Sequence, residues 1–207
     1  MKVAVVDYGM SNLGSVTRVL EELGVTPFLA STPERLRHAD RMILPGVGSF
    51  GDGMACLTAK GLDHSIREQV VAGKPILGIC LGMQLLATAG TEGGDWPGLG
   101  LVPGVVRRLD ALGCNLRIPH VGWNDIKLSA GSRDLFAGIP DGTDFYFVHS
   151  FAFEVTHTAS AAATVVYGAP LCAAVVDNNV FGTQFHPEKS SRAGFRLLKN
   201  FLEYRPC

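Results

Sequence analysis

Gly78-Ile79-Cys80-Leu81-Gly82 is the stretch from which the fold can be predicted outward. The apolar run Pro75-Ile76-Leu77 comes before it, and Met83-Gln84-Leu85-Leu86-Ala87, which is typical of a helix, comes after it. Cys80 therefore falls at a sharp turn from a strand into a helix, as in the G-x-S-x-G elbow with sulfur in place of oxygen. The two glycines let the backbone bend tightly and leave room for a substrate. This pattern predicts a nucleophilic cysteine, although burial as a small apolar residue is the commoner fate of a free thiol.

Two neighbours of the cysteine are predicted to assist it. Leu81 follows the cysteine at the turn, so its backbone N–H is well placed to stabilise a developing oxyanion. A position at a helix N-terminus also favours the thiolate form of Cys80. Gln84 lies one turn further along, on the same face of the helix as the cysteine.

A base for the thiol is found in Gly182-Thr183-Gln184-Phe185-His186-Pro187-Glu188. Pro187 disfavours helical backbone at His186, so we expect an extended segment in which residues two apart project to one side. His186 and Glu188 then lie together, and the carboxylate fixes the tautomer of an imidazole that faces the thiol. The plainer interpretation is a strand-end histidine beside a solvated glutamate. The two motifs together favour a Cys-His-Glu triad.

Strands and helices alternate along the first half of the chain. Apolar, β-branched runs typical of buried parallel strands lie at 2–7, 26–30 and 41–44. Between and after these runs we expect helices. Ser11 caps the first helix and Gly24 ends it, and Thr32 caps the second helix with Pro33 at its first position. Gly61 is expected to break a later helix. This alternation predicts a parallel sheet with helices on both faces and a ligand site at the carboxyl ends of the strands.

The second half of the chain changes to short apolar runs separated by turns. The runs lie at 101–109, 118–128, 144–149, 161–167, 171–176 and 180–185. We expect them to continue the same sheet in antiparallel or mixed pairing, and residues 191–204 to form a closing amphipathic helix. The prediction for residues 1–207 is therefore an α/β fold: a single domain with an open, mixed, mostly parallel sheet flanked by helices.

The glycine-rich loop Pro45-Gly46-Val47-Gly48-Ser49-Phe50-Gly51 satisfies the dinucleotide pattern G-x-G-x-x-G. That interpretation is weak, because the loop follows the third strand and no strand-end acid lies about 20 residues further on. We expect instead that its backbone N–H groups approach a small substrate, as the second half of an oxyanion hole beside Cys80. A flexible surface turn is the alternative. A second glycine-rich segment, 89–100, carries Glu92 as a plausible acidic contact.

The composition excludes several classes of function. The 207 residues suffice for one sizeable core, and Lys plus Arg number 18 against 19 Asp plus Glu, so no basic field argues for nucleic acid or a membrane surface. No stretch approaches the roughly 20 apolar residues that span a bilayer, and the first apolar run is too short for a signal peptide. Five cysteines without a C-x-x-C pair suggest neither a disulfide framework nor a zinc site. We expect a cytoplasmic, reduced protein without a metal or cofactor.

Two further residues are candidates with open alternatives. Trp123 follows a glycine in Pro119-His120-Val121-Gly122-Trp123-Asn124, which suits an interface anchor and ordinary core packing about equally. His149 ends the run at 144–149, at the edge where ligands collect, but has no carboxylate within two residues. It is therefore a weaker candidate base than His186.

Four motifs carry a family resemblance. They are V-V-D-Y-G-M-S-N (5–12), P-G-V-G (45–48), G-I-C-L-G-M-Q-L-L (78–86) and G-T-Q-F-H-P-E-K-S (182–190). Together they resemble class I glutamine amidotransferases, and among these the glutaminase subunits of imidazole glycerol phosphate synthases. The likeness runs from Asp7 to Ser190, nearly the whole chain, and P-H-V-G-W-N and Y-F-V-H-S add to it.

The resemblance implies a flavodoxin-like fold and a glutaminase reaction. Cys80 attacks the side-chain amide of L-glutamine, while His186, oriented by Glu188, protonates departing ammonia and then activates water against the glutamyl thioester. The backbone amides that stabilise the oxyanion are those of Leu81, Val47 and Gly48. The residues that hold the amino-acid end of the substrate are Gln84, Glu92, Ser150 and Phe151. At Phe151 the sequence departs from the family pattern, which often has tyrosine.

The resemblance also implies a partner, because the sequence holds no second active site that could consume ammonia. The partner is a cyclase subunit of the (β/α)₈-barrel type, which forms a heterodimer and receives the ammonia through an internal channel. It makes imidazole glycerol phosphate and aminoimidazole carboxamide ribotide in histidine biosynthesis. Asn12 and Trp123 are the candidate contacts. Since isolated glutaminases of this family are nearly silent, we expect the Val47–Gly48 peptide to reorient before the oxyanion hole is complete.

Other functions stay open at this point. The chain could serve another synthase, such as those for pyridoxal phosphate, anthranilate or guanylate, although P-H-V-G-W-N and H-P-E-K-S weigh against this. It could be a non-catalytic module that binds a metabolite, although such a module has no physical need for an intact Cys80, His186 and Glu188. It could also be a thiol hydrolase or a redox-sensing cysteine protein with a similar sheet.

Overall fold

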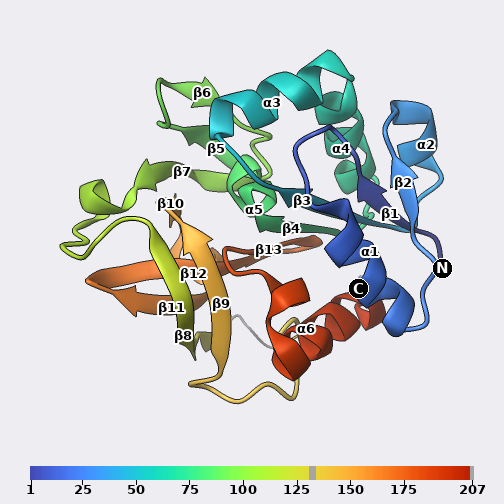
Figure 1. Cartoon of the computed structure of the whole chain (residues 1–207). Coiled ribbons are helices and arrows are strands. Elements are labelled where there is room, and N and C mark those ends of the chain that lie inside the picture. The colour runs from blue at the N-terminus through green and yellow to red at the C-terminus, as the bar shows by residue number, and fades with distance from the viewer. Residues whose placement is uncertain (131–133, 206–207) are drawn as a thin grey trace.

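A nine-stranded sheet runs through the whole molecule (Figure 1). The computed structural model describes residues 1–130 and 134–205. In spatial order the strands are β2 (Phe28–Ala30), β1 (Val3–Val6), β3 (Arg41–Gly46), β4 (Ile76–Cys80), β13 (Val180–Thr183), β12 (Ala169–Asp177), β11 (Ala161–Tyr167), β8 (His120–Leu128) and β9 (Asp144–His149). The first five are parallel to one another, and the pairs from β13 to β9 are antiparallel. The predicted mixed sheet is confirmed.

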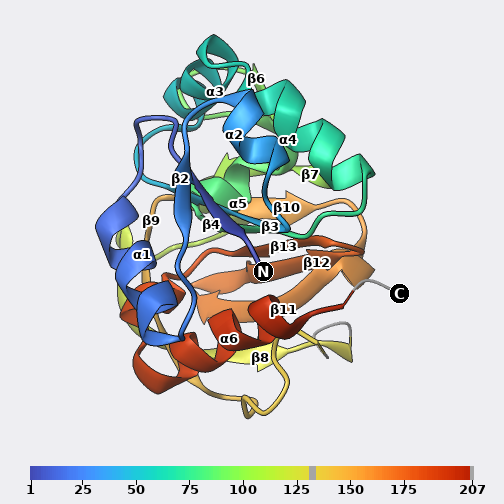
Figure 2. The same cartoon turned by 90° about the vertical axis from the view of Figure 1, so that its right-hand side faces the viewer.

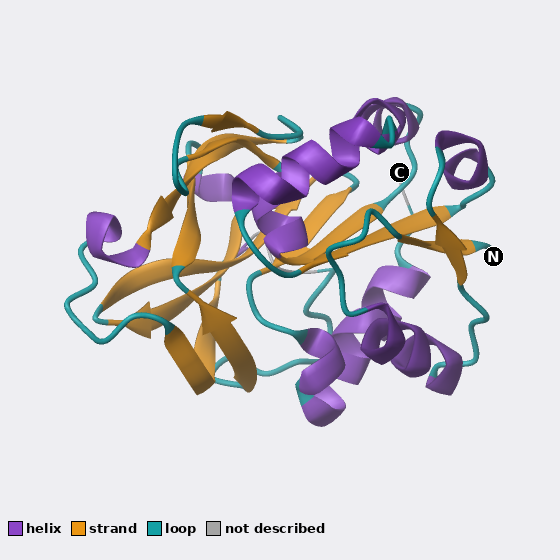
Figure 3. Cartoon of the chain, turned by 45° about the horizontal axis from the view of Figure 1, so that its top comes forward, coloured by secondary structure: helices purple, strands orange, loops and turns teal. Residues whose placement is uncertain are grey.

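Helices cover both faces of this sheet, as the alternating pattern predicts (Figures 2 and 3). On one face lie α1 (Leu13–Glu22) and α6 (Ser191–Glu203), and on the other lie α2 (Pro33–Arg37), α3 (Phe50–Ala59), α4 (Leu62–Val71) and α5 (Leu81–Leu85). Each face has its own apolar core, because the parallel strands are buried on both sides. No helix in the described part of the chain is long and apolar enough to cross a membrane.

A second, smaller sheet corrects one expectation. The apolar run at 101–109 does form a strand, β7 (Val102–Arg108), but it does not join the main sheet. It pairs with β10 (Phe151–Val155) and β5 (Ala87–Gly90), and β5 also pairs with β6 (Trp96–Pro97). A run of apolar residues identifies a strand but does not identify the strand with which it pairs. Here β5 begins directly after α5, outside the main sheet, and β7 pairs with it.

The helix boundaries confirm some predicted caps and correct others. Thr32 caps α2, where its hydroxyl accepts the Arg35 N–H, and Gly61, with φ of 64°, separates α3 from α4. Ser11 was expected to cap α1, but Asn12 occupies that position and makes no side-chain cap bond. Three 3₁₀ turns complete the described helices: η1 (Leu109–Leu112), η3 (Thr158–Ser160) and η4 (Pro187–Lys189).

Candidate active site

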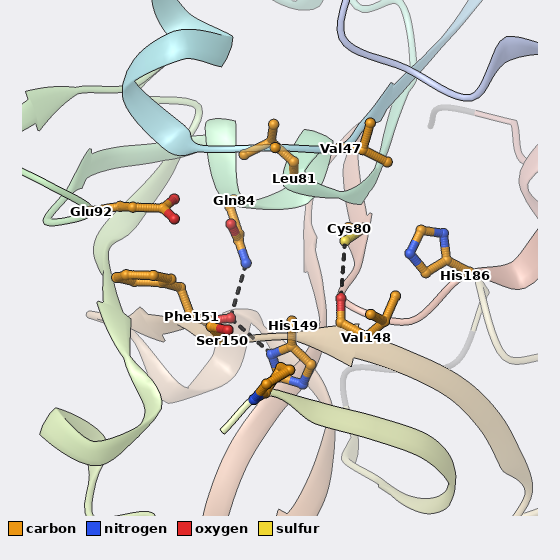
Figure 4. A pocket seen from close by; sticks show the side chains of 12 residues that line it. Val47, Cys80, Leu81, Gln84, Glu92, Val148, His149, Ser150, Phe151 and His186 are labelled. Carbon is orange, nitrogen blue, oxygen red and sulfur yellow. Dashed lines mark hydrogen bonds between the residues drawn. The ribbon is translucent and has the colours of Figure 1, made fainter. Parts of the chain in front are cut away.

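A cavity of about 370 Å³ opens at the carboxyl ends of β3 and β4, where the alternating pattern placed a ligand site. Segments from distant parts of the sequence meet in its wall (Figure 4). The residues that line it are Val47, Gly48, Cys80, Leu81, Gln84, Glu92, Pro119, Val148, His149, Ser150, Phe151 and His186. All the residues assigned to catalysis, to the oxyanion or to substrate by the sequence are therefore here, except Glu188, which lies behind His186.

The nucleophile elbow is present, and its glycines have a packing role. Cys80 ends β4 and precedes α5 with φ of 55° and ψ of −112°, a strained conformation for a non-glycine residue. A Cβ added to Gly82 would lie 1.7 Å from the Leu44 carbonyl oxygen, and one added to Gly78 would lie 2.6 Å from the Gly82 oxygen. The two glycines thus let β3, β4 and α5 approach one another, and this packing holds Cys80 in the strained turn.

His186 and Glu188 form a buried pair behind the sulfur. The Nδ1 atom of His186 lies 2.8 Å from Oε1 of Glu188, and both side chains are almost fully buried. The pairing was expected, but not its backbone: only His186 is extended, and Pro187 begins the 3₁₀ turn η4 that carries the carboxylate round to the imidazole. Proline suits this first position because its missing N–H is not needed there.

The charge of His186 is set by two opposing effects. Burial lowers its pKa, but the favourable interactions of the imidazolium with the Cys80 and Glu188 side chains outweigh burial and raise the pKa to about 9. In Figure 4 the imidazole lies beside the Cys80 sulfur, and its buried Nε2 atom makes no hydrogen bond within the described part of the chain. A protonated ring therefore has its Nε2–H available to a thiolate or to a leaving group.

The backbone of His186 is tied to the edge strand β9. Its N–H donates to the Tyr146 carbonyl at 3.0 Å. The Ser190 hydroxyl donates to the His186 carbonyl at 2.6 Å and accepts the Tyr146 N–H at 3.0 Å. The imidazole is thus positioned by β9 as well as by its carboxylate.

The backbone of the glycine-rich loop is already engaged at Val47. Leu81 is the first residue of α5, two residues before the predicted helical stretch, so its N–H is one of those that a helix start leaves without a helical partner. The Val47 N–H, in contrast, donates to the Met10 carbonyl at 2.9 Å. Gly48 has φ of 107°, which L side chains rarely adopt. For the Val47 N–H to join the oxyanion hole predicted from the sequence, its hydrogen bond to the Met10 carbonyl would have to break.

Polar groups at the other end of the cavity suit an amino-acid head group. The Glu92 carboxylate points into the cavity from the end away from His186 (Figure 4), and its Oε2 accepts the Phe50 N–H at 2.8 Å. Gln84 donates from Nε2 to the Phe151 carbonyl and to Gln184 Oε1, both at 2.9 Å. Because both of its N–H groups are engaged, its own oxygen is the atom left for a ligand.

Gln184 is a residue of the site that the sequence reasoning missed. Its side chain is fully buried, and its Nε2 lies 3.8 Å from the Cys80 sulfur. A local signal was available, because the extended segment expected from the sequence would place Gln184, two residues before His186, on the same side of the chain.

His149 has no free ring nitrogen, which removes it as the second candidate base. Nδ1 lies 2.8 Å from the Phe151 carbonyl and Nε2 lies 2.9 Å from Nδ1 of His120. Burial lowers the pKa of both histidines to about 4, so both are neutral.

The two candidate partner contacts lie outside the cavity that holds Cys80. Trp123 is 51% exposed on β8 and meets the Tyr146 ring edge-on at 6.0 Å, so the alternative of core packing is wrong. Asn12 is exposed at the start of α1, and it also lines a small second cavity of about 10 Å³ together with Val47, His186 and Glu188.

Comparisons with known proteins show what this chain is similar to. The family described as glutamine amidotransferase class-I matches residues 4–204. Imidazole glycerol phosphate synthase subunit HisH of Moorella thermoacetica is 47% identical over 201 residues, covering 97% of this chain and 94% of that protein. The subunit of the same name from Rhodospirillum rubrum is 44% identical over 214 residues and covers all of both chains. Among solved structures, PurLQS from Thermotoga maritima has a TM-score of 0.76 at 23% identity over 98% of each chain, and a glutamine amidotransferase has 0.75 at 21% over 97% of each. These two structures show the fold alone.

Proposed function

Because this chain belongs to the class I glutamine amidotransferase family, we propose that it hydrolyses L-glutamine to glutamate and ammonia as the glutaminase subunit of an imidazole glycerol phosphate synthase in histidine biosynthesis. The observation that carries the reaction is the convergence of Cys80, His186 and Glu188 on one cavity that also holds polar groups for an amino-acid end. The choice of synthase rests on relatives of that name that match almost the whole chain.

The proposed reaction uses the thiolate of Cys80 as nucleophile. Its sulfur forms a bond to the side-chain carbon of glutamine, and the carbonyl oxygen takes up the negative charge. His186 gives its Nε2 proton to the amide nitrogen as the C–N bond breaks and ammonia leaves. Water then attacks the thioester and gives a proton back to Nε2, and the C–S bond breaks to release glutamate. Glu188 holds Nδ1 and stabilises the imidazolium throughout.

The substrate is proposed to lie along the cavity, from Glu92 at one end to Cys80 and His186 at the other. The free oxygen of Glu92 pairs with the α-ammonium group, since a buried cation needs a carboxylate. Ser150, Phe151 and the oxygen of Gln84 bind the rest of the amino-acid end. This places the side-chain amide beside Cys80, where the Leu81 N–H supports the oxyanion.

The ammonia is proposed to pass to a cyclase subunit of (β/α)₈-barrel type. Trp123 on the outer face of β8 and β9 is a suitable anchor, since Val121 and Val148 beside it in the strand register are exposed as well. Asn12 is the second proposed contact. The small cavity that it shares with His186 and Glu188 brings a contact at Asn12 close to the triad.

The isolated subunit is proposed to be nearly inactive. The hydrogen bond from the Val47 N–H to the Met10 carbonyl supports this, because that N–H is directed to a backbone oxygen of the same chain. Binding of ligand to the cyclase would favour a loop in which the Gly46–Val47 peptide as well as the Val47–Gly48 peptide has turned, so that the Val47 and Gly48 amides complete the oxyanion hole with Leu81. The glycines at 46 and 48 make the reorientation inexpensive.

The test is glutamate release from L-glutamine, measured for the wild type and Cys80→Ala, each alone and each mixed with a barrel cyclase subunit and its ribonucleotide. We expect release only in the wild-type mixture, with the ammonia nitrogen in the imidazole product. Cys56→Ala, which removes a half-buried thiol in α3 outside the cavity, is the matched control and should retain full activity. An equal rate for the lone subunit and the complex would refute the proposed activation.

A synthase of another kind is the remaining candidate. If the wild type stays inactive in the mixture but a glutamine-like electrophile alkylates Cys80 and glutamine protects it, the nucleophile is right and the partner is wrong. A pull-down of the bound subunit would then identify the synthase.

A further inference from the structure

Two side-chain amides connect the Phe151 carbonyl to the nucleophile. The carbonyl oxygen can only accept, so the group of Gln84 that lies 2.9 Å from it must be the amide nitrogen. The second N–H of that nitrogen donates to Gln184 Oε1, also at 2.9 Å. The Gln184 amide is therefore turned with its oxygen toward Gln84 and its nitrogen toward the Cys80 sulfur, at 3.8 Å. The orientation of both amides follows from one backbone carbonyl.

The same carbonyl is held from a second direction. His149 donates to it from Nδ1, which leaves Nε2 of this neutral ring as an acceptor for the Nδ1–H of His120. Nε2 of His120 must then accept from the amide of Asn124, at 3.1 Å. The His120 ring is packed between Phe147 and Tyr167, with centroid distances of 4.9 and 4.1 Å. The Phe151 carbonyl thus ends a fixed, directional series of donors and cannot turn away from Gln84.

The sulfur of Cys80 receives opposite influences from its neighbours. The Val148 carbonyl, 3.9 Å away, can only accept a hydrogen bond, so it favours the protonated thiol. The Gln184 N–H donates to sulfur, so it favours the thiolate. The Gln184 amide is fully buried, where such a contact is not weakened by water.

We propose that Gln184 is a positioning residue for the nucleophile: it holds an amide N–H against the Cys80 sulfur, and the Phe151 carbonyl, acting through Gln84, fixes the direction of that amide. This inference deepens the proposed function, since it concerns the same thiol. It also places the substrate residue Gln84 and the nucleophile in one hydrogen-bonded unit.

The test compares two nearly isosteric variants. Gln184→Glu keeps an oxygen for Gln84 but replaces the N–H beside sulfur by a carboxylate oxygen, and Gln184→Met removes all hydrogen bonding at similar size. The rate of Cys80 alkylation by iodoacetamide is measured from pH 5 to 10, with the Cys80 peptide quantified by mass spectrometry. We expect the profile to move to higher pH, with a rate at neutral pH lower by roughly tenfold for Met and by more for Glu.

The readout separates this role from a merely structural one. The titratable groups around the sulfur, His186, His149 and Tyr8, are unchanged in both variants, so a displaced profile reports on residue 184. Gln69→Glu, the same chemical change at a buried glutamine in α4, is the matched control and should leave the profile in place. Circular dichroism verifies folding. If Gln184→Glu does not fold, the profile of Gln184→Met alone tests the inference.

A folded Gln184→Met protein with the wild-type profile would overturn the inference. Alkylation requires neither glutamine nor a cyclase, so this result is independent of the proposed function. A displaced profile together with an inactive wild-type mixture would support Gln184 and refute the glutaminase proposal.

Discussion

The pKa of His186 depends on its two neighbours, Cys80 and Glu188. Its pKa is raised from 6.5 to about 9 in the folded protein. A group whose folded pKa is raised stabilises the fold fully below its unfolded pKa, and this stability is lost as the pH rises through the folded pKa. We therefore expect the contribution of His186 to the free energy of unfolding to be complete below about pH 6.5 and absent above about pH 9.

Glu188→Gln tests the electrostatic part of this arrangement. The amide keeps the size and can still accept the Nδ1–H, but the negative charge is gone, so the pKa of His186 should fall from about 9. NMR titration of the His186 ring proton measures this. We expect glutaminase kcat in the complex to drop roughly 10²–10⁴-fold.

The stability of this variant should depend on pH in a defined way. Glu188→Gln should be less stable than the wild type below about pH 6.5, and the difference should shrink as the pH approaches 9. Glu203→Gln, which removes a carboxylate from the exposed pair with Lys199, is the control and should leave His186 unchanged. An unaltered titration in Glu188→Gln would contradict the assignment.

The elbow formed by β4 and α5 depends on backbone contact with β3. Gly82→Ala would place a Cβ 1.7 Å from the Leu44 carbonyl oxygen, and backbone cannot yield as a flexible side chain can. We expect a loss of unfolding free energy of about 3 kcal/mol or more, measured by denaturant titration. Gly14→Ala in α1 is the matched control, because its Cβ would meet nothing within 4 Å; it should change stability by less than about 1 kcal/mol. Equal stability of the two variants would show that β3 and α5 can separate locally.

Most helices and strands of this protein could be predicted from the sequence, but not all of the strand pairing. Continuous apolar runs and cap residues such as Thr32 act locally, so strands, helices and the elbow at Cys80 followed from them. The pairing of β7 with β5 and β10 did not, because it depends on where the chain goes after α5.

Side-chain geometry was harder to predict than the elements. The pairing of His186 with Glu188 followed from Pro187, but the 3₁₀ turn that produces it did not. The spacing from His186 could have placed Gln184 at the site, but its contact with Cys80 joins residues 104 positions apart and does not follow from that spacing. The bond between Val47 and Met10 is likewise a contact between two loops, visible only once β1 and β3 are side by side.

At the scale of the whole molecule, the edge of the sheet joins the proposed docking surface to His186. Trp123 contacts Tyr146, and the Tyr146 carbonyl accepts the His186 N–H. We expect Trp123→Ala to weaken cyclase binding by at least roughly tenfold, as loss of an exposed aromatic anchor does, while the thermal stability of the lone subunit stays close to wild type. Isothermal titration calorimetry measures the binding.

The control for this surface lies elsewhere on the same sheet. Val166 on β11 is 74% exposed and is not in the β8–β9 register, so Val166→Ala should bind the cyclase as the wild type does. If both variants bind with wild-type affinity, the partner docks on another face.

The bond between the Val47 N–H and the Met10 carbonyl has a consequence for how much of this protein a cell can safely make. Glutamine is a general nitrogen donor, so a glutaminase that worked whenever it was present would drain nitrogen and release free ammonia. If this bond keeps the lone subunit inactive, as proposed, copies produced in excess of the partner would consume almost nothing. The synthesis of the two subunits would then not need to be matched closely.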